Sequence, residues 1–124
     1  MSSRWWVAVS FALAACANAG SPRLRGTWVG SSVGNFSLPE LPAATAWAKG
    51  LQVRFDAREM TIRLTGELPR YGAYQVAAQQ DNSIIVDIKK PHGALERMSL
   101  MFVEPDKMRW DLGDGRYVTL LRAD

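Results

Sequence analysis

Apolar and polar side chains alternate through most of the chain after residue 21, and a period of two is typical of β-strands with one buried face. Residues 51–56 place Leu51, Val53 and Phe55 on one side of a strand, and residues 60–65 repeat the pattern. The few polar residues between these two segments favour a hairpin turn. The alternation therefore predicts an antiparallel, all-β fold.

The same pattern continues to the end of the chain and predicts eight strands joined by short turns. If the last strand pairs with the first, the sheet has no exposed edge. The sequence thus predicts a small eight-stranded antiparallel up-and-down barrel. We expect its strands at residues 26–32, 51–56, 60–65, 72–78, 83–89, 95–103, 108–112 and 117–122.

One segment breaks the alternation. Residues 38–49 contain Pro39, Pro42 and an alanine-rich run, and Gly50 follows them. Proline near the start and glycine just past the end favour a short helix between the first two strands, beginning near Pro42. Such a helix would cap one end of the barrel or cover part of the sheet. The alternative is an irregular loop held in place by Trp47.

Both ends of the predicted barrel carry residues of a known pattern. Gly26, Thr27 and Trp28 open the first strand, and Arg122 lies near the end of the last. This combination resembles the calycin superfamily of lipocalins and fatty-acid-binding proteins. The resemblance implies a lipocalin-like barrel that is closed at its base by the guanidinium of Arg122 lying over the indole of Trp28. The chain is shorter than a typical lipocalin, which implies shorter hairpins and a smaller interior.

The predicted inward positions are bulky, so we expect side chains to fill most of the interior of this barrel. A cavity open at one end is the alternative, and the flexible Met60 and Met98 would adapt to an apolar guest. Phe36 and Trp47, in a flap beside that end, complete the predicted ligand site. A hollow barrel predicts binding of a small hydrophobic molecule or lipid. A filled barrel predicts a protein-interaction or inhibitor module that acts through its loops or outer face.

Some apolar residues fall on the face that should be in water. If the helix does not cover this face and bulges do not shift the strand phase, an apolar exterior indicates a contact with a protein partner or a second copy. The residues concerned are Ile85, Met101, Val103, Tyr117 and Leu121.

Catalytic and cofactor-binding patterns are missing from the sequence. The single histidine, His92, lies in a predicted turn, where a solvated side chain is its ordinary role. Asp111 and Asp114 offer too few oxygen donors for a calcium loop. The formal net charge is +3, with acids interleaved among the bases, unlike a nucleic-acid-binding surface. We therefore expect no enzyme activity, cofactor, metal or nucleic-acid partner, unless titratable groups converge in a deep pocket.

The N-terminal residues look like a bacterial lipoprotein signal. Arg4 precedes an apolar run over residues 5–15, far shorter than the roughly 20 apolar residues of a membrane-spanning helix. Leu13-Ala14-Ala15-Cys16 resembles a lipobox. The resemblance implies cleavage before Cys16, acylation of its thiol with fatty acids such as palmitate, and membrane anchoring in the cell envelope. The outer membrane is favoured because alanine, not aspartate, follows Cys16.

Two other interpretations of this segment stay open. Ala17-Asn18-Ala19 is a competing cleavage signal that would release a soluble periplasmic or secreted protein beginning at Gly20. Alternatively, Cys16 is a buried residue of an uncleaved helix. We favour a signal peptide over residues 1–15, a tether over residues 16–25 and a barrel domain over residues 26–124. The chain has one cysteine and therefore no intramolecular disulfide, so packing must stabilise the barrel.

Overall fold

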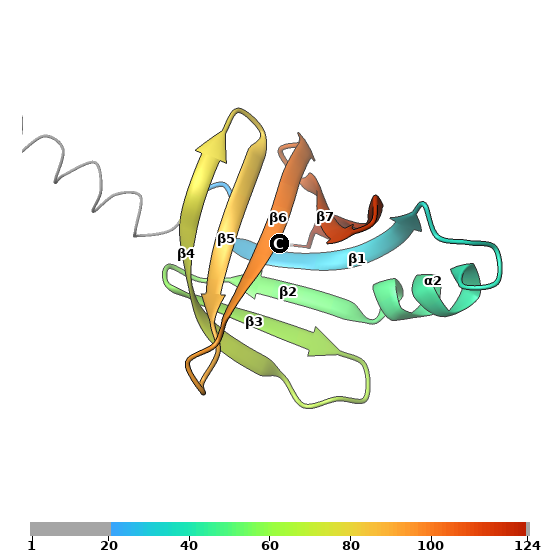
Figure 1. Cartoon of the computed structure of the whole chain (residues 1–124), viewed down its shortest axis with the longest axis horizontal. Coiled ribbons are helices and arrows are strands. Elements are labelled where there is room, and N and C mark those ends of the chain that lie inside the picture. The colour runs from blue at the N-terminus through green and yellow to red at the C-terminus, as the bar shows by residue number, and fades with distance from the viewer. Residues whose placement is uncertain (1–20, 124) are drawn as a thin grey trace, which may run out of the picture.

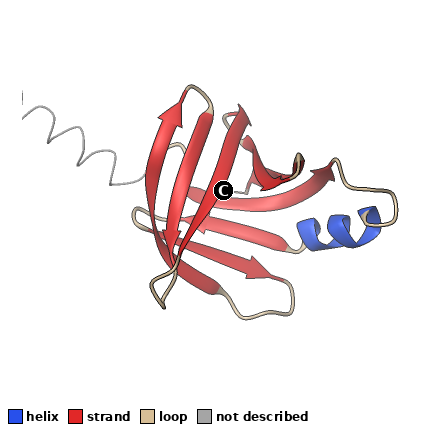
Figure 2. Cartoon of the chain, viewed as in Figure 1, coloured by secondary structure: helices blue, strands red, loops and turns tan. Residues whose placement is uncertain are grey.

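The computed structural model describes residues 21–123, which form a closed barrel of antiparallel strands with one helix at its end (Figures 1 and 2). Each strand pairs with its neighbours along the chain, and β8 pairs with β1 to close the barrel. The predicted fold class is confirmed. The elements are β1 (Gly26–Gly34), α2 (Leu41–Lys49), β2 (Leu51–Phe55), β3 (Glu59–Leu64), β4 (Arg70–Gln80), β5 (Ser83–Lys89), β6 (Leu95–Glu104), β7 (Lys107–Gly113) and β8 (Arg116–Arg122).

The strand alternation determines which side chains enter the core. Val53 lies opposite both Trp28 on β1 and Ile62 on β3, so inward residues of neighbouring strands meet in rows. Bulges interrupt the register in β1, β4, β6 and β7, and bulges let short strands bend around a barrel. The fully buried large side chains are Leu24, Trp28, Leu51, Val53, Phe55, Ile84, Val86, Met108, Val118 and Leu120.

Residues 21–25 lie across the end of the barrel where β1 begins and β8 ends. Leu24 is fully buried, and its carbonyl oxygen accepts a 2.8 Å hydrogen bond from Nε1 of Trp28. Arg23 donates to the carbonyl of Asp81 at 3.0 Å and to the side chain of Asn82 at 3.1 Å, in the β4–β5 turn. This part of the predicted tether therefore packs as part of the barrel. The predicted signal peptide and Cys16 lie outside the described residues.

Helix α2 lies at the opposite end and packs against β1. The contact is so close that a Cβ atom on Gly30 would lie 1.9 Å from the carbonyl oxygen of Ala48. Ala48 is fully buried, and Gly50 follows the helix as its C-cap. The predicted helix is confirmed and the irregular-loop alternative is wrong. Only a residue without a side chain at position 30 allows this approach of helix to strand.

The outer wall keeps an apolar surface. Met101, Val103 and Leu121 are 49%, 45% and 39% exposed, so helix α2 does not cover them. Ile85 and Tyr117 are half-buried. The guanidinium of Arg109 lies over the ring of Tyr117, 4.4 Å from its centre. Three of the five residues predicted to face outward therefore remain well exposed on this wall.

Candidate functional site

The two predicted closure residues meet at the end of the barrel that residues 21–25 cover, which we call the sealed end. Trp28 and Arg122 are opposite each other in the β1–β8 register, and the guanidinium lies 4.3 Å from the centre of the indole ring. The same guanidinium donates to the carbonyl oxygens of Arg25 at 2.6 Å and Arg23 at 2.8 Å, and to the Asp106 carboxylate at 2.9 Å. Arg122 thus joins residues 21–25 to the β6–β7 turn beneath the barrel.

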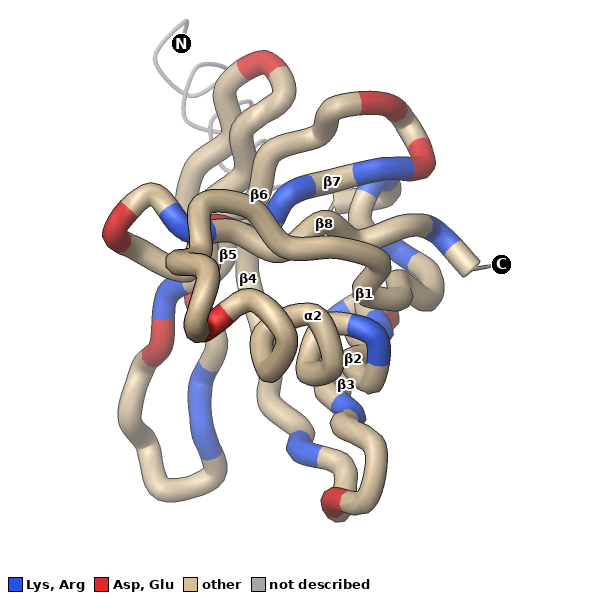
Figure 3. Tube along the Cα trace, turned by 90° about the vertical axis from the view of Figure 1, so that its right-hand side faces the viewer, with Lys and Arg blue, Asp and Glu red and all other residues tan. Residues whose placement is uncertain are grey.

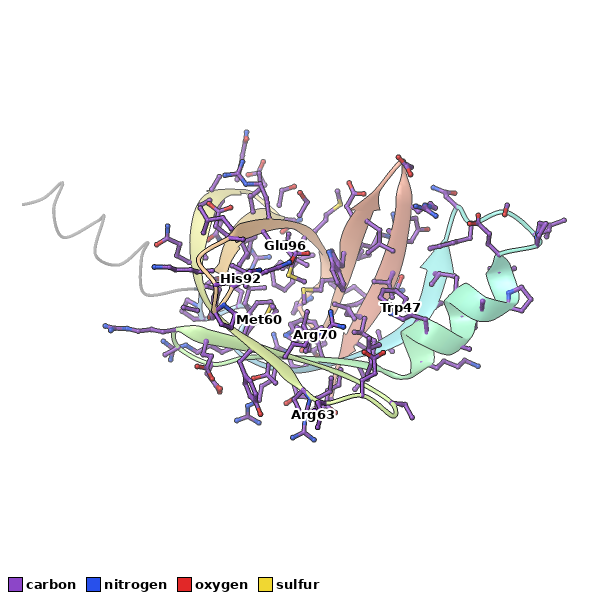
Figure 4. All side chains as sticks on the ribbon, turned by 60° about the horizontal axis from the view of Figure 1, so that its bottom comes forward. Trp47, Met60, Arg63, Arg70, His92 and Glu96 are labelled. Carbon is purple, nitrogen blue, oxygen red and sulfur yellow. The ribbon has the colours of Figure 1, made fainter. Side chains whose placement is uncertain are left out.

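The other end of the barrel is hollow. A cavity of about 580 Å³ opens to solvent between α2, the β3–β4 loop and the β5–β6 hairpin. Figure 4 looks toward this opening, with Trp47 on the α2 side and Met60 behind the rim. The lining residues are Trp47, Leu51, Met60, Ile62, Leu64, Glu67, Leu68, Pro69, Arg70, Tyr71, Ile88, Lys90, Pro91, His92, Glu96, Met98 and Trp110.

The depth of the cavity is apolar. Met60 and Met98 are buried and line it, as the predicted ligand site requires. Trp47 faces Trp110 at a ring-centre distance of 6.1 Å, so two indoles form one side of the cavity. Both indoles are half-buried, and both line the cavity. A guest that enters here meets thioether, aliphatic and aromatic carbon.

The rim of the cavity is charged. Arg70 pairs with Glu67 at 3.4 Å in the β3–β4 loop, and Lys90 pairs with Glu96 at 3.1 Å across the β5–β6 hairpin. His92 lies between them in the turn and is exposed, as the sequence predicts. Sequence reasoning missed the four paired residues. Their positions beside Pro69 and Pro91, in the two turns at one barrel end, were the available signal.

The titratable groups of this rim stay in water. The side chains of Glu67 and Glu96 are 51% and 55% exposed, and each is neutralised by an adjacent cation. A general acid or base is normally placed among groups that shift its proton affinity, in reach of a bound substrate. This rim suits the polar end of a ligand better than proton transfer at depth.

Phe36 does not line the cavity. Its ring lies 5.2 Å from the guanidinium of Arg116, beside the β7–β8 turn. Asn35 donates to the carbonyl of Gly115 at 2.9 Å, and Arg116 pairs with Glu40 at 3.7 Å. The hydrogen bond from Ser37 holds the pKa of Glu40 below its ordinary value, and Arg116 adds to this effect. These contacts fix the loop before α2 to the β7–β8 turn, and Phe36 belongs to this attachment and not to the cavity lining.

The cavity corrects the expectation that side chains fill most of the interior. That expectation holds in the half near Trp28, where the core is closed. It is wrong in the half near α2, where Ile62, Leu64 and Trp110 are only half-buried. Barrel width depends on strand tilt and stagger as well as on strand number, and counting inward side chains does not give these quantities.

Residues 21–123 have neither a metal-binding cluster nor a membrane-spanning helix. Among residues 21–123, no group of three or more His, Cys, Asp and Glu side chains is placed to hold a metal ion. In the same range, no helix has the length and apolar character needed to cross a membrane.

Comparison with known proteins gives no match. No protein-family model matches the chain, and neither a curated protein nor a solved structure matches it. The closed eight-stranded barrel is compatible with a calycin-like fold at the level of architecture. The function must therefore be inferred from the cavity and its surroundings.

Proposed function

We propose that this protein binds a small hydrophobic or amphiphilic molecule in the open end of its barrel. The supporting observation is the cavity of about 580 Å³, which is apolar in its depth and charged at its rim. Its volume falls within the range of roughly 300–1,000 Å³ that small-molecule sites occupy. Binding fits this site better than catalysis does, because the two carboxylates at the rim are exposed and each is paired with a cation.

The division between depth and rim suggests how the ligand lies. Its apolar part would contact Met60, Met98 and Trp110, where each buried methylene contributes about 0.8 kcal/mol. Its polar end would stay at the mouth, beside the pairs Arg70–Glu67 and Lys90–Glu96. Both signs of charge are present there, which suits a polar or zwitterionic end group as well as an ionic one.

A cavity-filling variant tests this proposal. Ile62 lines the cavity and is half-buried, so the indole of Ile62→Trp can occupy the space that a ligand would take. Met101→Trp places the same side chain on the exposed outer wall and is the control. We expect a fluorescent naphthalene sulfonate probe to bind the natural chain and Met101→Trp, and to bind Ile62→Trp at least about tenfold more weakly. Equal binding to all three chains would contradict the proposal, and native mass spectrometry reports any ligand retained from the cell.

We further propose that the barrel is anchored in the cell envelope through acylated Cys16, with the outer membrane favoured. The supporting observation is the lipobox-like segment that ends at Cys16. Metabolic labelling with palmitate should mark the natural chain and leave Cys16→Ser unlabelled. A label that persists in Cys16→Ser would overturn the anchor. A mature N-terminus at Gly20 would instead support the soluble periplasmic or secreted form.

The outer wall supports a second candidate function, a contact with another protein or a second copy. Exposed Met101 lies beside a shallow hollow of about 380 Å³ that also includes Ile85, Arg109 and Tyr117. Light scattering of the purified chain across a concentration series tests self-association. If Met101→Asp leaves the measured mass unchanged at every concentration, this wall is not a contact between copies.

A further inference from the structure

The two hairpins beside the cavity mouth carry large apolar side chains into water. Leu68 in the β3–β4 loop is 87% exposed, Leu95 at the start of β6 is 71% exposed, and Tyr71 at the start of β4 is 57% exposed. Single exposed leucines are common on protein surfaces. Here Leu68 and Tyr71 line one opening, and Leu95 precedes Glu96, which also lines it. Each of the three is more exposed than the apolar residues of the outer wall. Such clustering indicates a surface that is covered in use.

Cations accompany these apolar tips. Residues 63–71 and 89–96 contain Arg63, Arg70, Lys89 and Lys90 against Glu67 and Glu96, four positive charges against two negative, or +2 with His92 neutral. Figure 3 shows both hairpins projecting in the same direction below α2, with these charges along their arms. In Figure 4 Arg63 points away from the opening while Arg70 lies at it. Arg70 and Lys90 line the opening, so these two cations lie at the mouth itself.

We propose that the mouth of the barrel docks on an anionic lipid bilayer, with Leu68, Tyr71 and Leu95 inserted among the head groups. Apolar tips on separate projections, with cations set slightly behind them, match the depth profile of such a membrane. A protein interface instead has a close-packed core that is depleted of charged residues, whereas these apolar tips stand on separate hairpins with charges beside them. This inference rests on the proposed function, because docking gives an amphiphile a path from the bilayer into the cavity that avoids water.

The chain's N-terminal side lies away from the mouth. Residues 21–25 lie at the sealed end, opposite the mouth. An attachment through the residues that precede them therefore leaves the mouth free. Only residues 16–20 separate the proposed anchor from the sealed end, and five extended residues span at most about 18 Å. If Cys16 is acylated, the bilayer that the mouth contacts is therefore a different one from the bilayer that holds the anchor.

A polarity-sensitive bimane probe at single cysteines tests the docked orientation. The full chain carries Cys16→Ser together with either Leu95→Cys at the mouth or Leu121→Cys on the outer wall. With phosphatidylglycerol-containing vesicles, we expect the probe at position 95 to shift to the blue and to become protected from an aqueous quencher. The probe at position 121 should stay accessible, and the difference should shrink in high salt or with pure phosphatidylcholine. Equal responses at the two positions, or full access at position 95, would overturn docking by the mouth.

A second measurement separates docking from ligand binding. Leu95 does not line the cavity, so Leu95→Asp should take up the naphthalene probe from solution as the natural chain does. The rate of transfer of a fluorescent fatty acid from anionic vesicles should fall about tenfold in this variant. An unchanged transfer rate contradicts docking. If no chain takes up the probe from solution, the proposed function fails while the bimane measurement still reports the orientation.

Discussion

The two ends of this barrel are built from the same kinds of residue in opposite ways. At the sealed end Trp28 is fully buried and its ring NH is hydrogen-bonded, and Arg122 closes the surface over it. At the open end Trp47 is half-buried against a cavity, and cations pair at the rim instead of over the ring. The comparison indicates that Trp28 stabilises the fold, whereas Trp47 lines the cavity that we propose as the ligand site.

The largest expected effect follows from Trp28→Ala. Removing a fully buried indole leaves a void beside Phe102, whose ring centre is 5.9 Å from that of Trp28. We expect a loss of about 3–5 kcal/mol in the free energy of unfolding. Urea titration followed by circular dichroism measures it. An unchanged midpoint would show that the sealed end does not stabilise the barrel.

Gly30→Ala tests whether the open end depends on the close packing of helix α2 against β1. The added Cβ would lie 1.9 Å from a backbone oxygen of α2, which cannot move without moving the helix. We expect a cost of about 3 kcal/mol, the upper part of the range for overpacking. Hydrogen exchange should then rise in α2 and remain slow at Trp28. An equal rise at both ends would mean that the two ends unfold as one unit.

Arg122→Ala should cost less than either change, about 2 kcal/mol, from the lost hydrogen bonds of a charged group. The guanidinium binds two backbone carbonyls and the Asp106 carboxylate, in addition to lying over Trp28. Arg122→Lys keeps the positive charge but loses the planar guanidinium and its several hydrogen-bond donors, so it should recover only part of this stability. Full recovery by lysine would reduce the role of Arg122 to that of a point charge.

Much of the fold is readable from the sequence because burial in a barrel follows strand alternation. Leu51, Val53 and Phe55 are all buried, as their spacing predicts. The helix was predictable because Pro42 and Gly50 mark its ends. The resemblance carried by Trp28 and Arg122 placed two residues together that are far apart in the chain.

The site was less predictable, because it depends on barrel shape and loop direction. Met60, Met98 and Trp47 were named as ligand contacts on their flexibility and position, and they line the cavity. Phe36 was named from the same flap, yet it contacts Arg116, because the Asn35 and Glu40 contacts turn its loop toward the β7–β8 turn. No alternation applies in loops, so the direction of such a side chain follows from tertiary contacts alone.

Trp47→Ala should weaken ligand binding more than it lowers stability, whereas Trp28→Ala should mainly lower stability. Its ring already faces a cavity, so truncation creates no new enclosed void, and we expect a cost of only about 1 kcal/mol. Probe binding should weaken on the order of tenfold, because one of the two facing indoles is gone. If instead stability falls as far as it does in Trp28→Ala, the open end is core and not a binding surface.

The smallest expected effect is the pH dependence contributed by Tyr74 near the sealed end. Its hydroxyl donates to the carbonyl of Asp56, and burial raises its pKa above the ordinary value. A raised pKa in the folded state means that this contribution to stability is complete below the ordinary tyrosine pKa of about 10 and declines as the pH rises above it. Tyr74→Phe should therefore be less stable than the natural chain by up to about 1 kcal/mol at neutral pH, and the gap should narrow in alkali. Tyr71→Phe, 57% exposed at the open end of the same strand, is the control. A gap that stays constant between pH values below and above about 10 would show that burial of the Tyr74 hydroxyl does not couple its ionisation to folding.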